Sequence, residues 1–216
     1  MSWHRGWAAG LLALTLAGCA AGPTEPRNLS DLKADLRAYH RSGAYLAEVA
    51  AVCREAAGWV ERRAPAGGRL AAVIDLDDTL WSNWPYFEAQ DFGYVPVAWA
   101  RWVEEARAPA LAPVASLVRG LPERGVSIVF LTARRERERA ATVRNLETIG
   151  LAEHGRLICQ PDGDERSNAG FKAAVRAELR AEGWSVILNL GDQASDLAGG
   201  VAERSFKLPN PVYRTD

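Results

Sequence analysis

From residue 70 onward the chain consists of short, uninterrupted apolar runs separated by amphipathic segments. Such runs are typical of parallel β-strands, because helices cover both faces of a parallel sheet and bury its strands completely. The runs occupy residues 70–76, 126–131, 156–159, 186–190 and, more briefly, 205–208. Residues 136–149 and 169–182 carry helical spacing, and each is followed by a glycine. The pattern predicts an α/β fold, a Rossmann-like parallel sheet flanked by helices.

Two helical segments accompany this sheet. Residues 29–66 are expected to form two helices, the first capped by Ser30 and separated from the second at Ser42-Gly43. Residues 81–121 are longer than a single crossover needs, so they predict a small helical insertion. Its aromatic side chains are Trp81, Trp84, Tyr86, Phe87, Phe92, Tyr94, Trp99 and Trp102. Clustered rings usually pack a small core, although one or two could instead contact a ligand.

The N-terminus is typical of an export signal. Arg5 precedes an almost uncharged run at residues 7–17. This run is too short to cross a bilayer, which takes roughly 20 apolar residues, but it suits the centre of a signal peptide. We therefore expect residues 1–18 to be a signal peptide and the protein to be exported. The signal peptide could be removed by ordinary cleavage around residues 17–21, which is the alternative to the lipid attachment described next.

The end of the apolar run predicts a lipid anchor. Leu16-Ala17-Gly18-Cys19 resembles the lipobox of bacterial lipoproteins, in which Cys19 would be lipidated and become the first mature residue. Ala20 resembles a signal for sorting to the outer membrane. Residues 19–28 are polar enough to serve as a tether. Residues 29–216 would then form one domain, held at a bacterial membrane through this anchor.

Composition limits the partners of the chain. Lysine and arginine total 26 against 27 acidic residues, a formal net charge of -1. This balance gives no long-range attraction for nucleic acid, so we expect no nucleic-acid partner and only local recognition of anions. The length of 216 residues with 48% hydrophobic content suits one core. Cys53 and Cys159 could form a disulfide in an exported protein or remain buried thiols; the oligomeric state is not indicated.

Chemically active side chains follow the predicted strands. Ligands of open α/β sheets bind beyond the carboxyl ends of the strands, and those positions together with one helix start hold Asp75, Asp77, Thr132, Lys172, Asp192 and Asp196. Each has a structural alternative. Asp77 and Asp78 could cap a turn, Thr132 could satisfy backbone, and Lys172 could be a solvated helix residue. Asp192 and Asp196 could be charges at a helix N-terminus. Their joint order favours a functional site.

The order of these motifs resembles that of the haloacid dehalogenase (HAD) superfamily. Within it, the chain is similar to the subfamily IIIB acid phosphatases, which include bacterial class C lipoprotein phosphatases. The matching motifs, within residues 29–214, are Asp75-Leu-Asp-Asp-Thr-Leu with Ser82-Asn83-Trp84-Pro85-Tyr86, Phe130-Leu-Thr-Ala-Arg134, Gly191-Asp-Gln-Ala-Ser-Asp196 and Phe206-Lys-Leu-Pro-Asn-Pro-Val-Tyr213. The resemblance implies a HAD fold.

The resemblance and the residue chemistry together imply phosphoryl transfer. A carboxylate can attack a dianionic phosphate monoester only if a cation neutralises its approach, and Mg²⁺ with oxygen ligands does this. Asp75 is expected to be the nucleophile, and Asp77 the acid and then the base, which favours an acidic optimum. Asp75 and Asp192 would bind Mg²⁺ through carboxylates, and Asp77, by the resemblance, through its backbone carbonyl.

Further residues would bind the phosphate. The Thr132 hydroxyl and the Lys172 ammonium would contact its oxygens, with Lys172 in the first turn of a helix, whose N-terminus favours anions. Asp196 would orient Lys172 or the metal-bound waters. Arg134 and the arginines at 135, 137 and 139 are interpreted as a solvated helix start. His4, His40 and His154 fit no catalytic pattern, which disfavours a histidine acid phosphatase.

The expected activity is Mg²⁺-dependent hydrolysis of small phosphate monoesters through an aspartyl-phosphate. Nucleoside 5′-monophosphates are the substrates that the resemblance suggests, with a ring of the insertion stacking on the base. Asp77 disfavours dehalogenation, which needs no second acid. Two alternatives stay open: a phosphotransferase that passes the phosphoryl group to an alcohol, and a non-catalytic surface protein that keeps the fold for binding or storage.

Overall fold

The computed structural model describes residues 25–215. The predicted signal peptide at 1–18, the lipid anchor at Cys19 and most of the tether lie outside the described residues. Among residues 25–215, no helix combines the length and apolarity needed to span a membrane.

A five-stranded parallel sheet forms the centre of the described region, in the order β3-β2-β1-β4-β5. The strands are β1 Leu70–Ile74, β2 Val126–Arg135, β3 Gly155–Gln160, β4 Ser185–Gly191 and β5 Ser205–Lys207. Every predicted strand is present, and the Rossmann-like parallel α/β fold is confirmed. β1 is buried at all its positions because it lies at the centre of the sheet, between β2 and β4.

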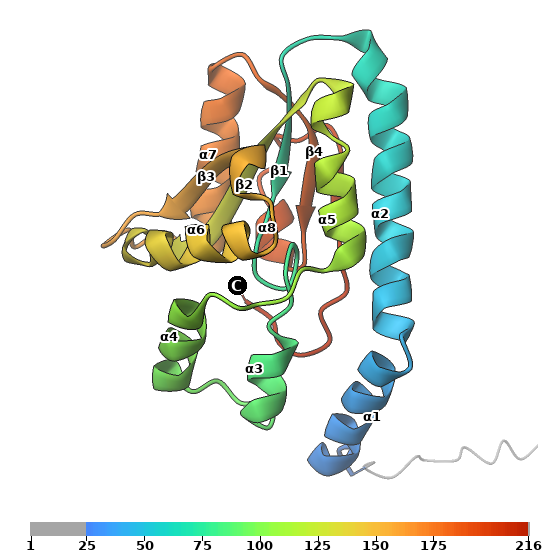
Figure 1. The fold of residues 1–216 in the computed structure, drawn as a ribbon, viewed down its shortest axis with the longest axis vertical. Coiled ribbons are helices and arrows are strands. Elements are labelled where there is room, and N and C mark those ends of the chain that lie inside the picture. The colour runs from blue at the N-terminus through green and yellow to red at the C-terminus, as the bar shows by residue number, and fades with distance from the viewer. Residues whose placement is uncertain (1–24, 216) are drawn as a thin grey trace, which may run out of the picture.

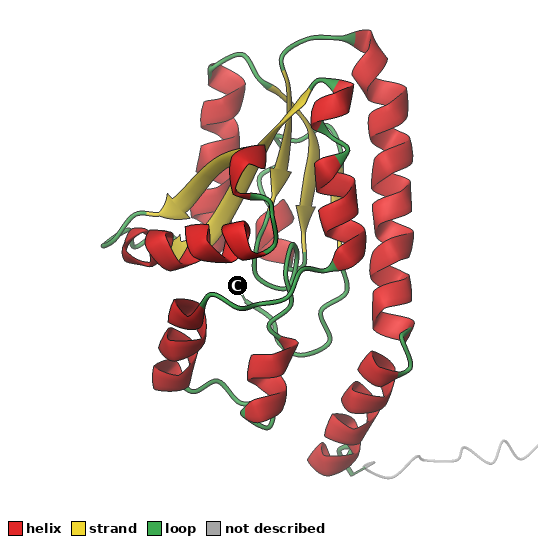
Figure 2. Cartoon of the chain, in the orientation of Figure 1, coloured by secondary structure: helices red, strands yellow, loops and turns green. Residues whose placement is uncertain are grey.

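Helices cover both faces of the sheet (Figures 1 and 2). Their bounds are α1 Leu29–Arg41, α2 Ala44–Arg63, α3 Trp84–Ala89, α4 Pro96–Glu105, α5 Ala112–Arg119, α6 Arg139–Thr148, α7 Asn168–Ala181 and α8 Ala194–Leu197. Short 3₁₀ helices occupy Ala64–Ala66, Pro122–Arg124, Glu136–Glu138 and Ala152–His154. The helix expected at 136–149 therefore begins as a 3₁₀ turn, and its α-helical part starts at Arg139.

Alternating strand residues divide the core into two layers. Ala72, Ile74, Ile128 and Phe130 belong to the larger cluster, which includes the buried faces of α2 and α5. Val73, Val129 and Leu131 point to the other face and pack with Phe171, Val175 and Leu179 of α7. This packing fixes α7 against the sheet and so positions the side chains at its N-terminal end.

Details at the N-terminal helices differ from the expectation. Asn28, not Ser30, caps α1, because its side-chain oxygen accepts the Ser30 N–H at 2.8 Å. α1 has no buried residue, whereas α2 buries five along one face.

Cys53 and Cys159 are buried free thiols, so the disulfide considered from the sequence does not form.

The segment at 81–121 contains helices, as expected, but α3 and α4 differ in position from α5. Figure 1 shows α3 and α4 beyond the carboxyl ends of the strands, whereas α5 lies beside α2 along the sheet. Trp81, Tyr86, Phe87 and Trp102 are buried. Phe92 and Trp99 pack against the same core, so six of the eight aromatic side chains of this segment belong to the core or pack against it.

Candidate active site

The chain turns sharply where it leaves β1. Asp78 has a left-handed backbone with φ 53°, a conformation that Asp tolerates better than most residues. The Leu76 carbonyl accepts N–H bonds from Thr79, Leu80 and Trp81. The Asp78 carboxylate accepts the Asn83 N–H at 2.8 Å, which closes the loop. Because of this turn, Asp75 and Asp77 both remain at the sheet edge instead of pointing to opposite faces.

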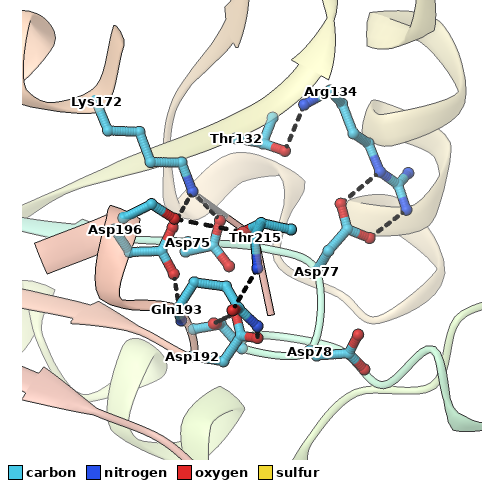
Figure 3. Close-up of polar contacts among 12 residues, drawn as sticks. Asp75, Asp77, Asp78, Thr132, Arg134, Lys172, Asp192, Gln193, Asp196 and Thr215 are labelled. Carbon is cyan, nitrogen blue, oxygen red and sulfur yellow. Dashed lines mark hydrogen bonds and ion pairs between the residues drawn. The ribbon is translucent and has the colours of Figure 1, made fainter. Parts of the chain in front are cut away.

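Lys172 joins two of the predicted carboxylates. Its Nζ lies 2.5 Å from Asp75 Oδ1 and 2.6 Å from Asp196 Oδ1, and all three side chains are at least 92% buried. Figure 3 shows Lys172 reaching down between them. A solvated lysine is thus excluded. Lys172 is the fifth residue of α7, just beyond the first turn in which the sequence placed it, and Ser167 caps that helix through Gly170 N–H.

Close approach of β4 and α8 completes this group. A side chain at Gly191 would lie 2.4 Å from Asp196 Cβ, so only glycine lets Asp196 sit against the end of β4. Asp196 Oδ2 accepts the Gln193 N–H at 2.8 Å, while Oδ1 accepts from Lys172. Asp196 thus contacts Lys172 directly, which is compatible with one of the two roles expected for it, the orientation of Lys172.

The electrostatics of the group are dominated by burial. Burial raises the pKa of Asp75 well above its ordinary value, against the opposing charge of Lys172. Burial, with the charges of Asp196 and Asp78, raises the pKa of Asp192 to about 7. Lys172 is also buried, but its two carboxylate neighbours raise its pKa. One buried ammonium thus faces more carboxylates than it can neutralise.

The surplus carboxylates fit a divalent cation. One oxygen each of Asp75, Asp192 and Asp196 lies within 4.8 Å of the others. Hard cations such as Mg²⁺ take oxygen ligands, and a second positive charge would offset the repulsion among buried carboxylates. Asp75 and Asp192 are two of the predicted ligands. Asp196 belongs to the same group, although the sequence assigned it an indirect role.

Asp77 lies beside this group and is held by Arg134. Arg134 Nε donates to Asp77 Oδ2 at 2.9 Å and Nη2 donates to Oδ1 at 2.7 Å, a bidentate pair visible in Figure 3. Trp81 Nε1 and Asn83 Nδ2 also donate to Oδ1, both at 3.0 Å. Asp77 Oδ2 therefore keeps the greater free acceptor capacity. Arg134 is 6% exposed and lies in β2, so its interpretation as a solvated helix start is wrong.

The ion pair decides the charge of Asp77. Burial alone would raise the pKa of Asp77, but the Arg134 charge and the surrounding N–H donors outweigh it and leave the pKa below its ordinary value. The structure thus presents the ionised form, which can accept a proton. The acid role expected for Asp77, and the acidic optimum derived from it, stay predictions.

Thr132 follows the core of β2 and is buried. Its Oγ1 accepts the Arg134 N–H at 3.1 Å, the backbone-satisfying role considered from the sequence. This bond uses an oxygen lone pair and leaves the hydroxyl hydrogen available to a ligand. Phosphate binding by Thr132 is compatible with this geometry.

A cleft of about 500 Å³ lies next to the group of charged side chains at the strand ends. Asp77, Lys172, Asp192 and Asp196 contribute to its floor and walls. Aromatic rings also line it, namely Phe87, Tyr94, Trp99 and Tyr213. The cleft therefore has both charged and aromatic lining residues, and of the aromatic ones Phe87, Tyr94 and Trp99 come from the predicted insertion.

Several residues of the site were missed from sequence. Arg134, Asn83 and Tyr213 stand in the motifs that carry the family resemblance, which was the available signal, but Arg134 was interpreted only as part of a solvated helix start and the other two were assigned no role. Asn210 and Gln193 likewise stand in those motifs, and both contact the Asp192 carboxylate. Asp78 was considered only as a turn residue, yet it also accepts the Tyr213 hydroxyl at 2.8 Å.

Comparison with known families identifies this arrangement. A family model described as HAD superfamily, subfamily IIIB (acid phosphatase) matches residues 23–216. Among solved structures, the class C acid phosphatase from Bacillus anthracis superposes with a TM-score of 0.70 at 22% identity, covering 86% of each chain. At that identity the likeness shows the fold.

Among curated proteins, acid phosphatase 1 of Solanum lycopersicum is 38% identical over 68% of this chain and 59% of its own length. Vegetative storage protein 2 of Arabidopsis thaliana is 30% identical over 98% of this chain and 78% of its own length. The aligned region thus spans little more than half of the tomato protein. These relatives are plant proteins and give no support for a bacterial lipid anchor at Cys19.

Proposed function

The chain belongs to the HAD superfamily, subfamily IIIB (acid phosphatase), and on this premise we propose that it hydrolyses phosphate monoesters with a bound Mg²⁺ ion. The observation that carries the proposal is the buried Asp75 carboxylate at the carboxyl end of β1, paired at 2.5 Å with Lys172, which lines an open cleft. The proposed anion-binding lysine and the proposed nucleophile are thus in direct contact.

The proposed reaction has two steps. An Asp75 carboxylate oxygen attacks phosphorus, the bond from phosphorus to the ester oxygen breaks, and Asp77, which must first take up a proton from solvent, gives that proton to the departing alkoxide. Asp77 then takes a proton from water, whose oxygen attacks the aspartyl-phosphate and releases inorganic phosphate and the Asp75 carboxylate. Asp77 Oδ2, with its spare acceptor capacity, is the atom suited to the proton transfers.

Charge stabilisation would come from the bound cation and from two side chains of the chain. Mg²⁺ held by Asp75 and Asp192, and by the Asp77 backbone carbonyl that the family resemblance implies, would neutralise the approaching anions. The Lys172 ammonium and the Thr132 hydroxyl would donate to the phosphoryl oxygens. Lys172 would exchange part of its contact with Asp75 for a phosphoryl oxygen, while Asp196 keeps it in position.

The cleft supports a substrate with a planar group. Tyr94, which is 64% exposed, and Trp99 line the cleft, with their ring centroids 6.2 Å apart. A nucleobase can stack on such rings whatever the base, because stacking does not depend on hydrogen bonds to the base edge. Nucleoside 5′-monophosphates are therefore the proposed substrate class.

A storage role is the second candidate, because two relatives are named vegetative storage proteins. A protein kept only for storage or binding is expected to lose the nucleophile. This chain retains Asp75 together with Asp77, Lys172 and Asp192. The retained set favours an enzyme.

A phosphotransferase would share the first step and differ in the acceptor. If an alcohol replaces water in the second step, added alcohol or nucleoside should yield a new phosphate ester at the expense of inorganic phosphate. Product analysis with each acceptor separates transfer from hydrolysis.

We predict that metal removal abolishes turnover reversibly. Without the cation, the dianionic substrate meets surplus buried carboxylates, so EDTA should lower phosphate release from p-nitrophenyl phosphate about 10²-fold or more, and excess Mg²⁺ should restore it.

The same assay with nucleotides, sugar phosphates and phosphotyrosine ranks these compounds as substrates. Failure of every substrate to release phosphate in excess Mg²⁺ would reject the proposed function.

We predict that Arg134→Lys lowers kcat more than it raises KM. Lysine keeps the charge but loses the bidentate geometry that fixes Asp77, and such misplacement costs about 10- to 100-fold. Steady-state kinetics on p-nitrophenyl phosphate measure the split. Arg144→Lys, at an exposed ion pair with Glu104, is the matched control and should match the wild type. An unchanged kcat in Arg134→Lys would contradict the positioning role.

A further inference from the structure

Two side-chain amides converge on one oxygen of Asp192. Asn210 Nδ2 lies 2.7 Å and Gln193 Nε2 lies 2.5 Å from Asp192 Oδ2. Within residues 25–215, the other carboxylate oxygen, Oδ1, accepts only the Thr79 hydroxyl, at 3.1 Å. Oδ2 is thus saturated by donors, and Oδ1 is the oxygen with lone-pair capacity left for a cation.

The orientation of both amides is fixed by their other bonds. Asn210 Oδ1 accepts the Val212 N–H at 2.9 Å and the Tyr213 N–H at 3.2 Å, so its NH₂ group must face Asp192. Gln193 Oε1 accepts the Thr215 N–H at 3.0 Å, which orients its NH₂ group in the same way. Neither amide can flip without losing backbone bonds.

The same bonds tie the C-terminal segment, residues 210–215, to the site. Asn210 and Gln193 each hold backbone of this segment with their oxygen and Asp192 with their nitrogen. The Tyr213 hydroxyl donates to Asp78 Oδ2 at 2.8 Å, and Tyr213, Arg214 and Thr215 line the cleft. One wall of the cleft is therefore connected to a predicted metal ligand through two amides.

We propose that Asn210 and Gln193 are positioning residues for the metal site. This pair, the amide clamp, fixes the rotation of the Asp192 carboxylate, leaves Oδ1 as the oxygen available to a cation, and couples cation binding to order in residues 210–215. The inference rests on the proposed Mg²⁺ site. Neither residue contacts the reacting atoms; each acts through Asp192, and outer hydrogen bonds of this kind commonly change metal affinity about 10- to 100-fold.

The competing explanation is that Asn210 only shapes the turn in Pro209-Asn210-Pro211. Asn210→Ser separates the two explanations. A serine hydroxyl can accept the N–H two residues on and so preserve the turn, but its shorter side chain cannot donate to Asp192. Gln193→Met tests the other amide with similar length and no charge. Neither variant changes the net charge, so altered cation affinity would not reflect a new electrostatic attraction.

The test is Mg²⁺ binding to the metal-free protein by isothermal titration calorimetry, with no substrate present. Asn210→Ser and Gln193→Met should each weaken binding about 10-fold or more. Hydrogen exchange followed by mass spectrometry should show that Mg²⁺ slows exchange at residues 212–215 in the wild type and less so in both variants. Asn28→Ser, which alters another asparagine that accepts a backbone N–H, is the matched control and should bind like the wild type.

The outcomes distinguish the clamp from the site. If Asp75→Asn abolishes binding while both clamp variants bind as tightly as the wild type, the clamp is rejected and the metal site stands. If Asn210→Ser resembles the wild type but Asn210→Ala does not, the role of Asn210 is turn formation alone. If the wild type binds no Mg²⁺ at millimolar concentration, the site and the clamp both fail.

Discussion

Asp75→Asn is expected to abolish phosphate release while the protein remains folded. Asparagine keeps the shape and can accept the Lys172 hydrogen bond, but its amide oxygen cannot form the aspartyl-phosphate. Removing a nucleophile costs other enzymes about 10⁴- to 10⁶-fold in kcat. We therefore expect turnover of p-nitrophenyl phosphate, in excess Mg²⁺ at pH 5 to 7, to fall at least about 10⁴-fold.

Asp75→Asn should lose turnover but gain thermal stability. Asp75 is buried beside Asp192 and Asp196, so its replacement by a neutral residue relieves repulsion among like charges. In the absence of added metal, Tm should rise, by about 2–4 °C for each kcal/mol gained. Asp91→Asn, on an exposed carboxylate paired with Lys33, is the control and should leave turnover unchanged. Wild-type turnover no higher than that of Asp75→Asn would reject the enzymatic function.

The fold could be predicted because strands that are buried on both faces of a sheet appear in the sequence as continuous apolar runs. Each parallel strand must be apolar on both sides, so the five runs are visible in the sequence whatever their order in the sheet. The convergence of Asp75 and Asp192 follows from the same rule, since carboxyl ends of parallel strands share one edge. Strand order itself was not readable, because it depends on pairing between segments distant in sequence.

Arg134 marks the limit of this reasoning. It stands among charged residues that do form a solvated turn, such as Glu136 and Arg139. In the sequence, its neighbours are as highly charged as theirs, so the sequence alone does not set it apart. The structure differs because β2 continues to Arg135, which carries the Arg134 side chain back over the cleft toward Asp77. Four residues of extended backbone beyond the predicted end at residue 131 thus convert an expected surface charge into a buried one.

Asn210 and Gln193 were missed for a different reason. Amide side chains have no charge pattern or period, and their role depends on which atom faces which partner. Only the two backbone N–H groups that Asn210 accepts reveal that its nitrogen must face Asp192. Such information is conformational, so a motif can indicate that a residue matters without indicating its contact.

Lys172→Met is expected to abolish turnover and also to unfold the protein at lower temperature. Methionine fills a similar volume but leaves Asp75 and Asp196 buried without the cation that each contacts within 2.6 Å. Breaking a buried ion pair by removing one partner typically costs about 3–5 kcal/mol. For a chain of this size that corresponds to a fall in Tm of roughly 6–20 °C, measurable by calorimetry without added metal.

Mg²⁺ distinguishes this electrostatic cause from a packing defect. A cation bound among the same carboxylates would replace part of the lost positive charge, so excess Mg²⁺ should raise the Tm of Lys172→Met by more than that of the wild type. Turnover should stay low, because the phosphoryl oxygens still lack their ammonium donor. Lys33→Met, at an exposed ion pair with Asp91, should change stability by less than about 1 kcal/mol. If the Tm of Lys172→Met matches that of Lys33→Met, the buried charge balance derived for Asp75, Lys172 and Asp196 is wrong.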